Sequence, residues 1–379
     1  MRILHVIDNL KLGGTQNLAF RTWQELIERG HDVVACVLVE STSEHQWTKL
    51  PQELFRLGCH GDYRRPFAID NWAKQLAKVV NQTKPDIIHS WLWLSDIVAA
   101  KAAVKCRVRH VVHLVDRRNW QQSNRLRDRY RCWATRRAFN KANSSFLAVS
   151  QAAGQFAIDS LRIAADRVEV AHNSIYTSEF FKIPDCDAWT APNRPLQLGI
   201  AARIEPEKGH KYLIEAMRIL QEKGVACTLK ITGDGTDRPY LEQMVRDKMR
   251  SDSIEFVGWV KDVAVFLAGI DIFLVPSIDS EGLPTTILEA MAAGRIVVAT
   301  DVGGAAEAIV DQKSGVIVQP RDARSIADAI AKISVNRDSA SLMARNARLA
   351  VTEKFSMHKM IQTIERAYAK VNGEEYRSC

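Results

Sequence analysis

The sequence lacks long hydrophobic runs, and nowhere do apolar residues continue for the roughly 18 positions that a membrane-spanning helix needs. The apolar run near the N-terminus is short and is interrupted by Asp8. We therefore expect a first buried strand over 3–7 rather than the core of a signal peptide. The 19 glycines and 11 prolines are too few for a fibrous or low-complexity chain of 379 residues.

Cysteine is scattered, and two familiar cofactor motifs are missing. The seven cysteines are odd in number and form no CxxC pair, which argues against a disulfide framework or a zinc site and favours the reducing cytoplasm. No G-x-G-x-x-G turn follows the first expected strand, which weakens the case for a NAD-dependent oxidoreductase. No DxD-type acidic cluster is evident, so we expect neither a metal nor a cofactor.

What the chain does contain is enough apolar material for two domains and an uneven distribution of charge. Hydrophobic residues make up 46% of the sequence. Residues 1–190 carry 27 basic and 19 acidic side chains, a balance of +8, whereas 191–379 carry 25 of each. Segment 101–141 alone has 13 basic and 2 acidic residues, a balance of +11. The two halves therefore meet different partners.

Apolar periodicity predicts alternating strands and helices in both halves. The expected strands are 3–7, 33–39, 86–89, 108–115, 146–149, 196–202, 228–232, 254–257, 272–275, 296–299 and 315–318. The expected helices are 15–29, 69–82, 95–104, 120–141, 151–160, 210–223, 236–250, 284–293, 322–333, 338–353 and 357–371. Three prolines within 184–195 predict a linker. The alternation indicates two doubly wound parallel sheets, with ligands outside the carboxyl ends of the strands and in a cleft between the domains.

The strongest chemical signal is the run from Glu281 to Glu289, which follows an expected strand and enters a helix. Backbone amides at a helix N-terminus bind anions. Carboxylates beside such a site accept hydrogen bonds from sugar or ribose hydroxyls. The alternative is that Glu281 caps the helix and Glu289 is solvated, although Glu289 lies in the apolar stretch ILEAMAAG.

Arg203 and Lys208 lie five residues apart in the loop after an expected strand. Two fixed cations there would hold a diphosphate and offset its charge as it leaves, although loop cations are more often solvated. Two glycine pairs, Gly13-Gly14 and Gly233-Asp-Gly235, each lie between a strand and a helix. They are candidate phosphate-approach loops, or they serve only in turns and caps.

His113 lies late in the strand 108–115. A histidine inside a parallel strand is more often a core residue. Because it lies near the carboxyl end of the strand, its side chain would instead reach the ligand cleft expected there.

Together these motifs resemble the retaining glycosyltransferases of family 4, which have the GT-B fold of two Rossmann-like domains. The resemblance spans nearly the whole chain and is most specific in the second half. The matching residues are Gly13-Gly14-Thr15, Arg203, Lys208-Gly209, Gly233-Asp-Gly235, Val257-Gly258, Pro276-Ser277, 281–289 and Thr300-Asp-Val-Gly-Gly304.

The resemblance implies a domain for the acceptor over 1–185 and one for the nucleotide sugar over 195–356, with 357–379 crossing back onto the first domain. It implies that Glu281 contacts the donor sugar and that Glu289 holds the ribose hydroxyls. Arg203 and Lys208 would bind the diphosphate, with the amides of Gly282 and Leu283 and the loop Gly13-Gly14. The donor-binding set also includes Gly233. The base would pack near Val257 and Val260, and His113 would lie near the reacting sugar.

The implied reaction retains the configuration of the sugar, and the leaving phosphate takes the acceptor proton. We expect a UDP-sugar, or else a GDP-sugar, and a saccharide or lipid-linked acceptor of bacterial cell-surface glycans on the cytoplasmic side of the membrane. Three interpretations of segment 101–141 stay open. It is a solvated basic surface, or it contacts anionic lipid or an anionic acceptor. The third is a contact with nucleic acid, for which the sequence has no supporting motif. The other functions left open are a nucleotide-sugar epimerase and a basic non-enzymatic binding module.

Overall fold

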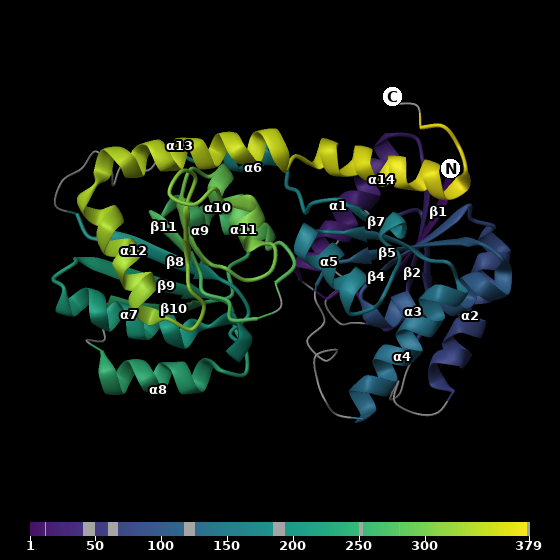
Figure 1. Ribbon diagram of the computed structural model, residues 1–379, viewed down its shortest axis with the longest axis horizontal. Coiled ribbons are helices and arrows are strands. Elements are labelled where there is room, and N and C mark those ends of the chain that lie inside the picture. The colour runs from purple at the N-terminus through teal and green to yellow at the C-terminus, as the bar shows by residue number, and fades with distance from the viewer. Residues whose placement is uncertain are drawn as a thin grey trace. The chain divides into compact units, whose positions relative to one another are not determined.

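The computed structural model describes residues 1–11, 13–40, 50–59, 67–116, 126–184, 194–249, 253–279 and 281–376. The chain divides into two compact units (Figure 1). Unit 1 comprises Met1–Asn173 together with His358–Cys379, and unit 2 comprises Ser174–Met357. Most of the expected linker 184–195 lies outside the described residues.

Unit 1 is built on a seven-stranded sheet in the order β3-β2-β1-β4-β5-β6-β7, and every neighbouring pair is parallel. Its strands are β1 (Arg2–Ile7), β2 (Asp32–Val37), β3 (Glu53–Arg56), β4 (Ile87–Trp91), β5 (Arg109–Leu114), β6 (Ser145–Ala148) and β7 (Val168–Val170). Five of these strands were expected. The two edge strands β3 and β7 were not, because they are short and only partly buried, so they carry no apolar run.

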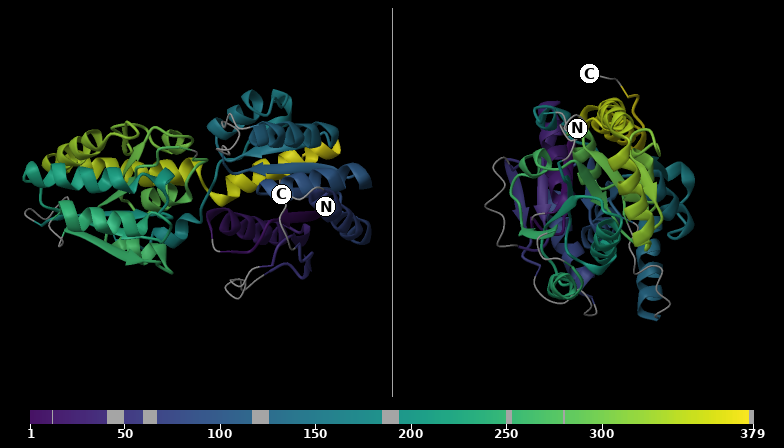
Figure 2. Two further views of the ribbon diagram at one scale, coloured as in Figure 1. Left: turned by 90° about the horizontal axis from the view of Figure 1, so that it is seen from below. Right: turned by 90° about the vertical axis from the view of Figure 1, so that its left-hand side faces the viewer.

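Helices cover both faces of this sheet (Figure 2). They are α1 (Gly14–Glu28), α2 (Ala68–Thr83), α3 (Trp93–Cys106), α4 (Leu126–Lys141), α5 (Gln151–Asp159) and, from the far end of the chain, α14 (Met357–Asn372). One face packs against α2 and α3 through aliphatic side chains such as Val6, Ile88 and Leu76. On the opposite face, His5 and His89 meet Trp23 of α1 and Tyr368 of α14.

Unit 2 is built on a six-stranded parallel sheet in the order β10-β9-β8-β11-β12-β13. Its strands are β8 (Leu196–Ala201), β9 (Cys227–Thr232), β10 (Ile254–Gly258), β11 (Ile272–Val275), β12 (Ile296–Thr300) and β13 (Val316–Val318). Its helices are α6 (Thr177–Phe180), α7 (His210–Glu222), α8 (Arg238–Lys248), α9 (Val263–Ala268), α10 (Thr285–Ala292), α11 (Ala305–Ala308), α12 (Ala323–Val335) and α13 (Arg337–Lys354). The short helices α6, α9 and α11 were not expected.

Two apolar cores lie on the two faces of the second sheet. One contains Leu213 and Met217 of α7, Leu241 of α8 and Ile330 of α12. The other contains residues of α9, α10 and α11 and the end of α13. The prediction of two doubly wound parallel sheets is therefore confirmed for each unit. Among the described helices, none combines the length and the apolar character needed to cross a membrane.

Candidate functional site

The strand order of unit 2 reverses between β8 and β11, which are neighbours in the sheet although β9 and β10 separate them in the chain. In doubly wound sheets the loops at the carboxyl ends of such strands diverge and leave a crevice for ligands. The loop after β8 carries Arg203 and Lys208, and the loop after β11 carries Glu281. Topology therefore brings two separately predicted motifs to one point.

Lys208 and Glu281 form an ion pair between these two loops. Both side chains are largely buried, with 21% and 10% of their surfaces exposed. The Ser277 hydroxyl donates a second hydrogen bond, of 2.5 Å, to the same Oε1 atom of Glu281. Among the described residues, Oε2 of Glu281 receives no hydrogen bond, and Lys208 has donors beyond the one that Glu281 uses. The pair can therefore bind a ligand without first breaking.

The backbone around Glu281 is fixed by the loop after β12. The Thr300 hydroxyl donates to the Ser277 carbonyl at 2.5 Å, and the Gly304 amide donates to the Gly282 carbonyl at 2.6 Å. Gly303 has φ +59°, and a Cβ at that position would lie 1.9 Å from the Glu281 carbonyl oxygen. Gly303 therefore allows two loop backbones to touch, which holds the Glu281 carboxylate in place.

Glycines in the neighbouring loops also serve close backbone packing. A Cβ at Gly209 (φ +71°) would lie 2.0 Å from the Pro276 carbonyl oxygen, and one at Gly233 (φ +125°) would lie 2.0 Å from that of Ala202. The Gly233 amide donates to the Gly258 carbonyl at 2.8 Å. These contacts give Gly233 a structural reason for being glycine. Its predicted role in donor binding stays a prediction.

Arg203 is the exposed cation of the site. Its side chain is 65% exposed and its guanidinium lies 3.5 Å from the Glu207 carboxylate. An exposed pair of this length contributes little to stability. Arg203 can therefore turn toward an anion at small cost, whereas Lys208 is held in position by Glu281.

Glu289 lies on α10, which begins four residues after Glu281. Gly282 and Leu283 connect Glu281 to this helix, and Leu283 is buried in the core of unit 2. Glu289 is partly buried and makes a polar interaction within the protein. Because α10 directs its positive end toward this loop, an anion near Gly282 and Leu283 would be stabilised. The individual roles of these residues stay predictions.

The predicted base-binding residues Val257 and Val260 line one pocket of about 380 Å³. Lys230, Phe266 and Gly269 complete part of its wall. Val257 is 40% exposed and the neighbouring Trp259 is 60% exposed. Apolar surface is thus available where the resemblance expects a base.

His210 was missed by the sequence reasoning. It opens α7 directly after Gly209 and is 1% exposed, and neither ring nitrogen has a hydrogen-bond partner among the described residues. Burial, together with the nearby charge of Lys208, lowers its pKa to about 4, so the ring is neutral at pH 7. The sequence did offer a signal for His210, because it lies two residues after the predicted phosphate-binding cation Lys208.

His113 lies in the core of unit 1 and is fully buried. Its ring stacks on Trp91 with centroids 4.0 Å apart, and its Nδ1 lies 3.2 Å from His89 Nε2. Burial lowers its pKa to about 3. We call His5, His89 and His113, with Trp91 and Tyr368, the histidine column. This packing favours the core interpretation of His113, and its catalytic role stays a prediction.

Gly13 and Gly14 follow β1 in unit 1, at the switch point of that sheet between β1 and β4. Gly13 has extended backbone (φ −177°) and precedes α1, whose first residue is Gly14. A Cβ at Gly13 would meet only the end of the Gln16 side chain at 2.6 Å, and one at Gly14 would meet nothing within 4 Å. Gly14 therefore leaves open space at the start of α1.

Two family models match the chain. The model described as "Glycosyltransferase Family 4" matches residues 12–179, and the one described as "Glycosyl transferases group 1" matches 186–350. The gap between the two models, residues 180–185, thus overlaps the beginning of the expected linker 184–195.

Curated relatives match parts of the chain. An alpha-D-kanosaminyltransferase of Streptomyces kanamyceticus is 30% identical over 244 residues, which is 62% of each chain. An amylovoran biosynthesis glycosyltransferase of Erwinia amylovora is 30% identical over 202 residues, which is 51% of this chain and 48% of that protein. The match spans between 42% and 62% of the length of these curated relatives.

Among solved structures, the protein HepE of Anabaena in complex with UDP superposes with a TM-score of 0.83. The alignment covers 98% of this chain and 100% of that one at 20% identity. At this identity, the likeness shows a common fold.

Proposed function

Because this chain belongs to glycosyltransferase family 4 and has the GT-B fold, we propose that it moves a sugar from a nucleoside diphosphate sugar to an acceptor hydroxyl with retention of configuration. One observation carries the proposal. Lys208, Glu281 and Ser277 form a buried hydrogen-bonded set at the switch point of unit 2. The set places a positioned ammonium beside a carboxylate oxygen that still has acceptor capacity, which suits a sugar diphosphate.

We assign the donor contacts by charge and position. Lys208 and Arg203 bind the diphosphate, aided by the positive end of α10 near Gly282 and Leu283. Glu281 accepts hydrogen bonds from sugar hydroxyls through Oε2, and Glu289 holds the ribose. Val257 and Val260 pack against the base, with Gly233 in the adjoining loop. A UDP-sugar is favoured because the similar Anabaena protein was solved with UDP and UDP-glucose, and a GDP-sugar is the alternative.

In the transfer step, the bond between the anomeric carbon and the diphosphate oxygen breaks, and its electron pair leaves with the diphosphate. The acceptor oxygen bonds to the anomeric carbon on the same face. Its proton passes to an oxygen of the leaving phosphate. Lys208 and Arg203 stabilise the charge that develops on the leaving group, so the proposed step needs neither a metal nor a cofactor. We propose acceptor binding as the role of unit 1. For Gly13 and Gly14 we propose a role in binding the donor phosphates, and for His113 a catalytic role.

For the acceptor we propose a saccharide or lipid-linked saccharide of a bacterial cell-surface glycan, and no nucleic acid. Support comes from the name of the Erwinia relative, a glycosyltransferase of amylovoran biosynthesis. A lipid-linked acceptor requires a cytoplasmic enzyme to work at a membrane surface. The basic segment 101–141 is where we expect that contact.

Nucleotide binding tests the proposal. The melting temperature would be measured with UDP, GDP, ADP and CMP for the wild-type chain, for Lys208→Met and for Lys223→Met. Lys223 also forms an ion pair in unit 2, with Asp328, but this pair is exposed and lies at the C-terminal end of α7, away from the carboxyl ends of the strands. A diphosphate at 100 times its Kd should stabilise the wild type and Lys223→Met by about 2.7 kcal/mol, and Lys208→Met much less. Flat curves for all nucleotides would overturn the donor site.

Acceptor dependence separates transfer from the alternatives. A transferase releases nucleoside diphosphate at a rate that rises with acceptor. An epimerase changes the sugar without such release, and a non-enzymatic module does neither.

A further inference from the structure

Helix α4 presents three of the cations of unit 1 on one exposed face. Its exposed side chains are Arg129, Tyr130, Trp133, Arg137, Asn140 and Lys141. They recur at spacings of three and four, so they share one side of the helix. The acid that α4 contains, Asp128, is buried. Of the α4 side chains that the structure describes, the outward face thus carries cations and no acid.

The opposite side of α4 fixes the helix to unit 1. The Trp93 indole donates to the Thr135 hydroxyl at 3.1 Å, and the Arg131 guanidinium lies 5.0 Å from the Trp93 ring centroid. Phe139 is fully buried and packs edge-on against Phe146. The helix is therefore anchored independently of its exposed face, and that face needs a different explanation.

Two large aromatic side chains lie in the middle of the exposed face. Tyr130 is 66% exposed and Trp133 is 55% exposed, and their ring centroids lie 5.8 Å apart. The Arg137 guanidinium lies 5.6 Å from the Trp133 centroid. Exposed aromatic area is unfavourable in water. Tyrosine and tryptophan flanked by arginine suit the boundary between lipid headgroups and acyl chains.

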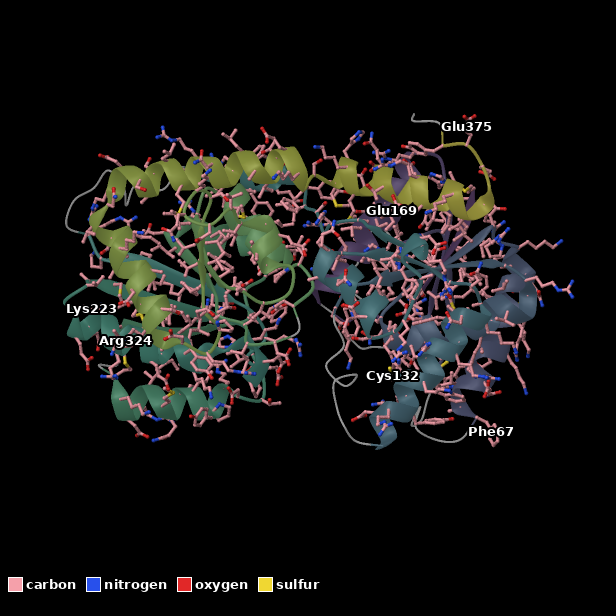
Figure 3. The ribbon with its side chains drawn as sticks, viewed as in Figure 1. Phe67, Cys132, Glu169, Lys223, Arg324 and Glu375 are labelled. Atoms are coloured by element: carbon pink, nitrogen blue, oxygen red, sulfur yellow. The ribbon has the colours of Figure 1, made fainter. Side chains whose placement is uncertain are left out.

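A third exposed aromatic residue, Phe67, precedes α2 and is 81% exposed. Figure 1 shows α2, α3 and α4 side by side in unit 1, with the beginning of α4 at the lower edge. Figure 3 labels Phe67 at the same lower edge. In this view Phe67 therefore lies at the same edge of the unit as the beginning of α4.

We propose that the exposed face of α4 docks on a membrane surface rich in anionic lipid, with Tyr130 and Trp133 inserted among the headgroups. The cations supply long-range attraction to the negative surface, and the aromatic rings supply short-range burial. A nucleic acid is less favoured because a single convex helix offers no groove that tracks a backbone. This inference rests on the membrane contact proposed above for segment 101–141, and vesicle binding tests it separately from the transfer reaction.

Sedimentation with vesicles tests it. The full chain would be mixed with vesicles of phosphatidylcholine, with or without phosphatidylglycerol, at low and high salt. We expect binding to the anionic vesicles only, and weaker binding at high salt. The double substitution Arg129→Glu with Arg137→Glu should lower the vesicle affinity at least about tenfold. Trp133→Ala should lower it by a smaller factor that persists at high salt.

The control is Arg246→Glu with Lys248→Glu on α8. That helix also has an exposed aromatic side chain, Tyr240, but Asp247 lies exposed between its two cations. An equal loss of vesicle affinity in the control and in the α4 variant would overturn the proposal. Equal binding to vesicles with and without phosphatidylglycerol would overturn it as well. If the wild-type chain does not bind vesicles but slows the migration of RNA in a gel, the proposal would be overturned in favour of a nucleic-acid contact. Glu289→Ala should bind vesicles normally, which separates this test from failure of the donor site.

Discussion

The two units use the same sheet architecture to place polar side chains in opposite electrostatic states. In unit 2, Lys208 and Glu281 are both charged groups, and they meet at the carboxyl ends of strands on loops held by glycine contacts. In unit 1, the histidine column lies within the sheet face itself, where burial lowers the pKa of each of its histidines. The histidines on the strands thus form a neutral core, whereas the side chains on the loops form an ion pair. Both the histidine column and the Lys208–Glu281 pair are largely shielded from water.

Lys208→Ala should have the largest effect, because it removes the charge that would stabilise the leaving diphosphate. We expect kcat/KM to fall 10²–10³-fold, about 2.7–4 kcal/mol in the transition state. Sugar-transfer kinetics with a UDP-sugar would measure this. Phe67→Ala changes an exposed side chain of unit 1 that is outside the predicted donor-binding set, so it should leave kcat/KM unchanged in free solution. An equal fall in both variants would remove the contrast between the units.

Gly209→Ala should destabilise unit 2 by about 2–3 kcal/mol, because the new Cβ meets the Pro276 carbonyl and the left-handed backbone disfavours alanine. Gly224 has the same φ of +71° but open space around it. Gly224→Ala should therefore cost only about 1 kcal/mol. Urea unfolding would measure the difference. Equal costs would mean that backbone strain alone, and not the packing of the two loops, requires glycine at 209.

Acidification should destabilise unit 1 through the histidine column. The pKa of His113 is about 3 in the folded chain against 6.5 in the unfolded chain. Between these values the unfolded state binds a proton that the folded state does not. Each such histidine therefore removes about 1.4 kcal/mol of stability per pH unit as the pH falls below 6.5. His113→Phe should flatten the pH dependence of the free energy of unfolding by that amount. An unchanged slope would contradict the burial of a neutral ring.

Tyr368→Phe should have the smallest effect. The Tyr368 hydroxyl lies 2.5 Å from His89 Nδ1, and both groups are fully buried. Removing the hydroxyl deletes one hydrogen bond and leaves a ring nitrogen without it, at a cost of about 1 kcal/mol. Nucleotide-induced stabilisation of unit 2 should stay intact, which thermal shift with UDP would show.

The fold was largely predictable because its strands are continuous apolar runs. Such a signal is absent from Glu53–Arg56 and Val168–Val170, which pair only at sheet edges. Lys208 and Glu281 were each predicted from their own loops. Their ion pair was not, because residues 73 positions apart meet only through the order of β8 and β11. The burial of His210 likewise depends on tertiary packing, which local sequence does not encode.

The discontinuity of unit 1 has a consequence for biosynthesis. Glu365 of α14 pairs with Arg29 and His31 near the end of α1, and Tyr368 closes the histidine column. A ribosome makes these partners only after all of unit 2. Until then the nascent unit 1 exposes the part of its sheet face that α14 covers, and the downstream unit can finish folding before the upstream one. A chaperone that recognises apolar sheet surface would therefore have its longest opportunity on the first half of this chain.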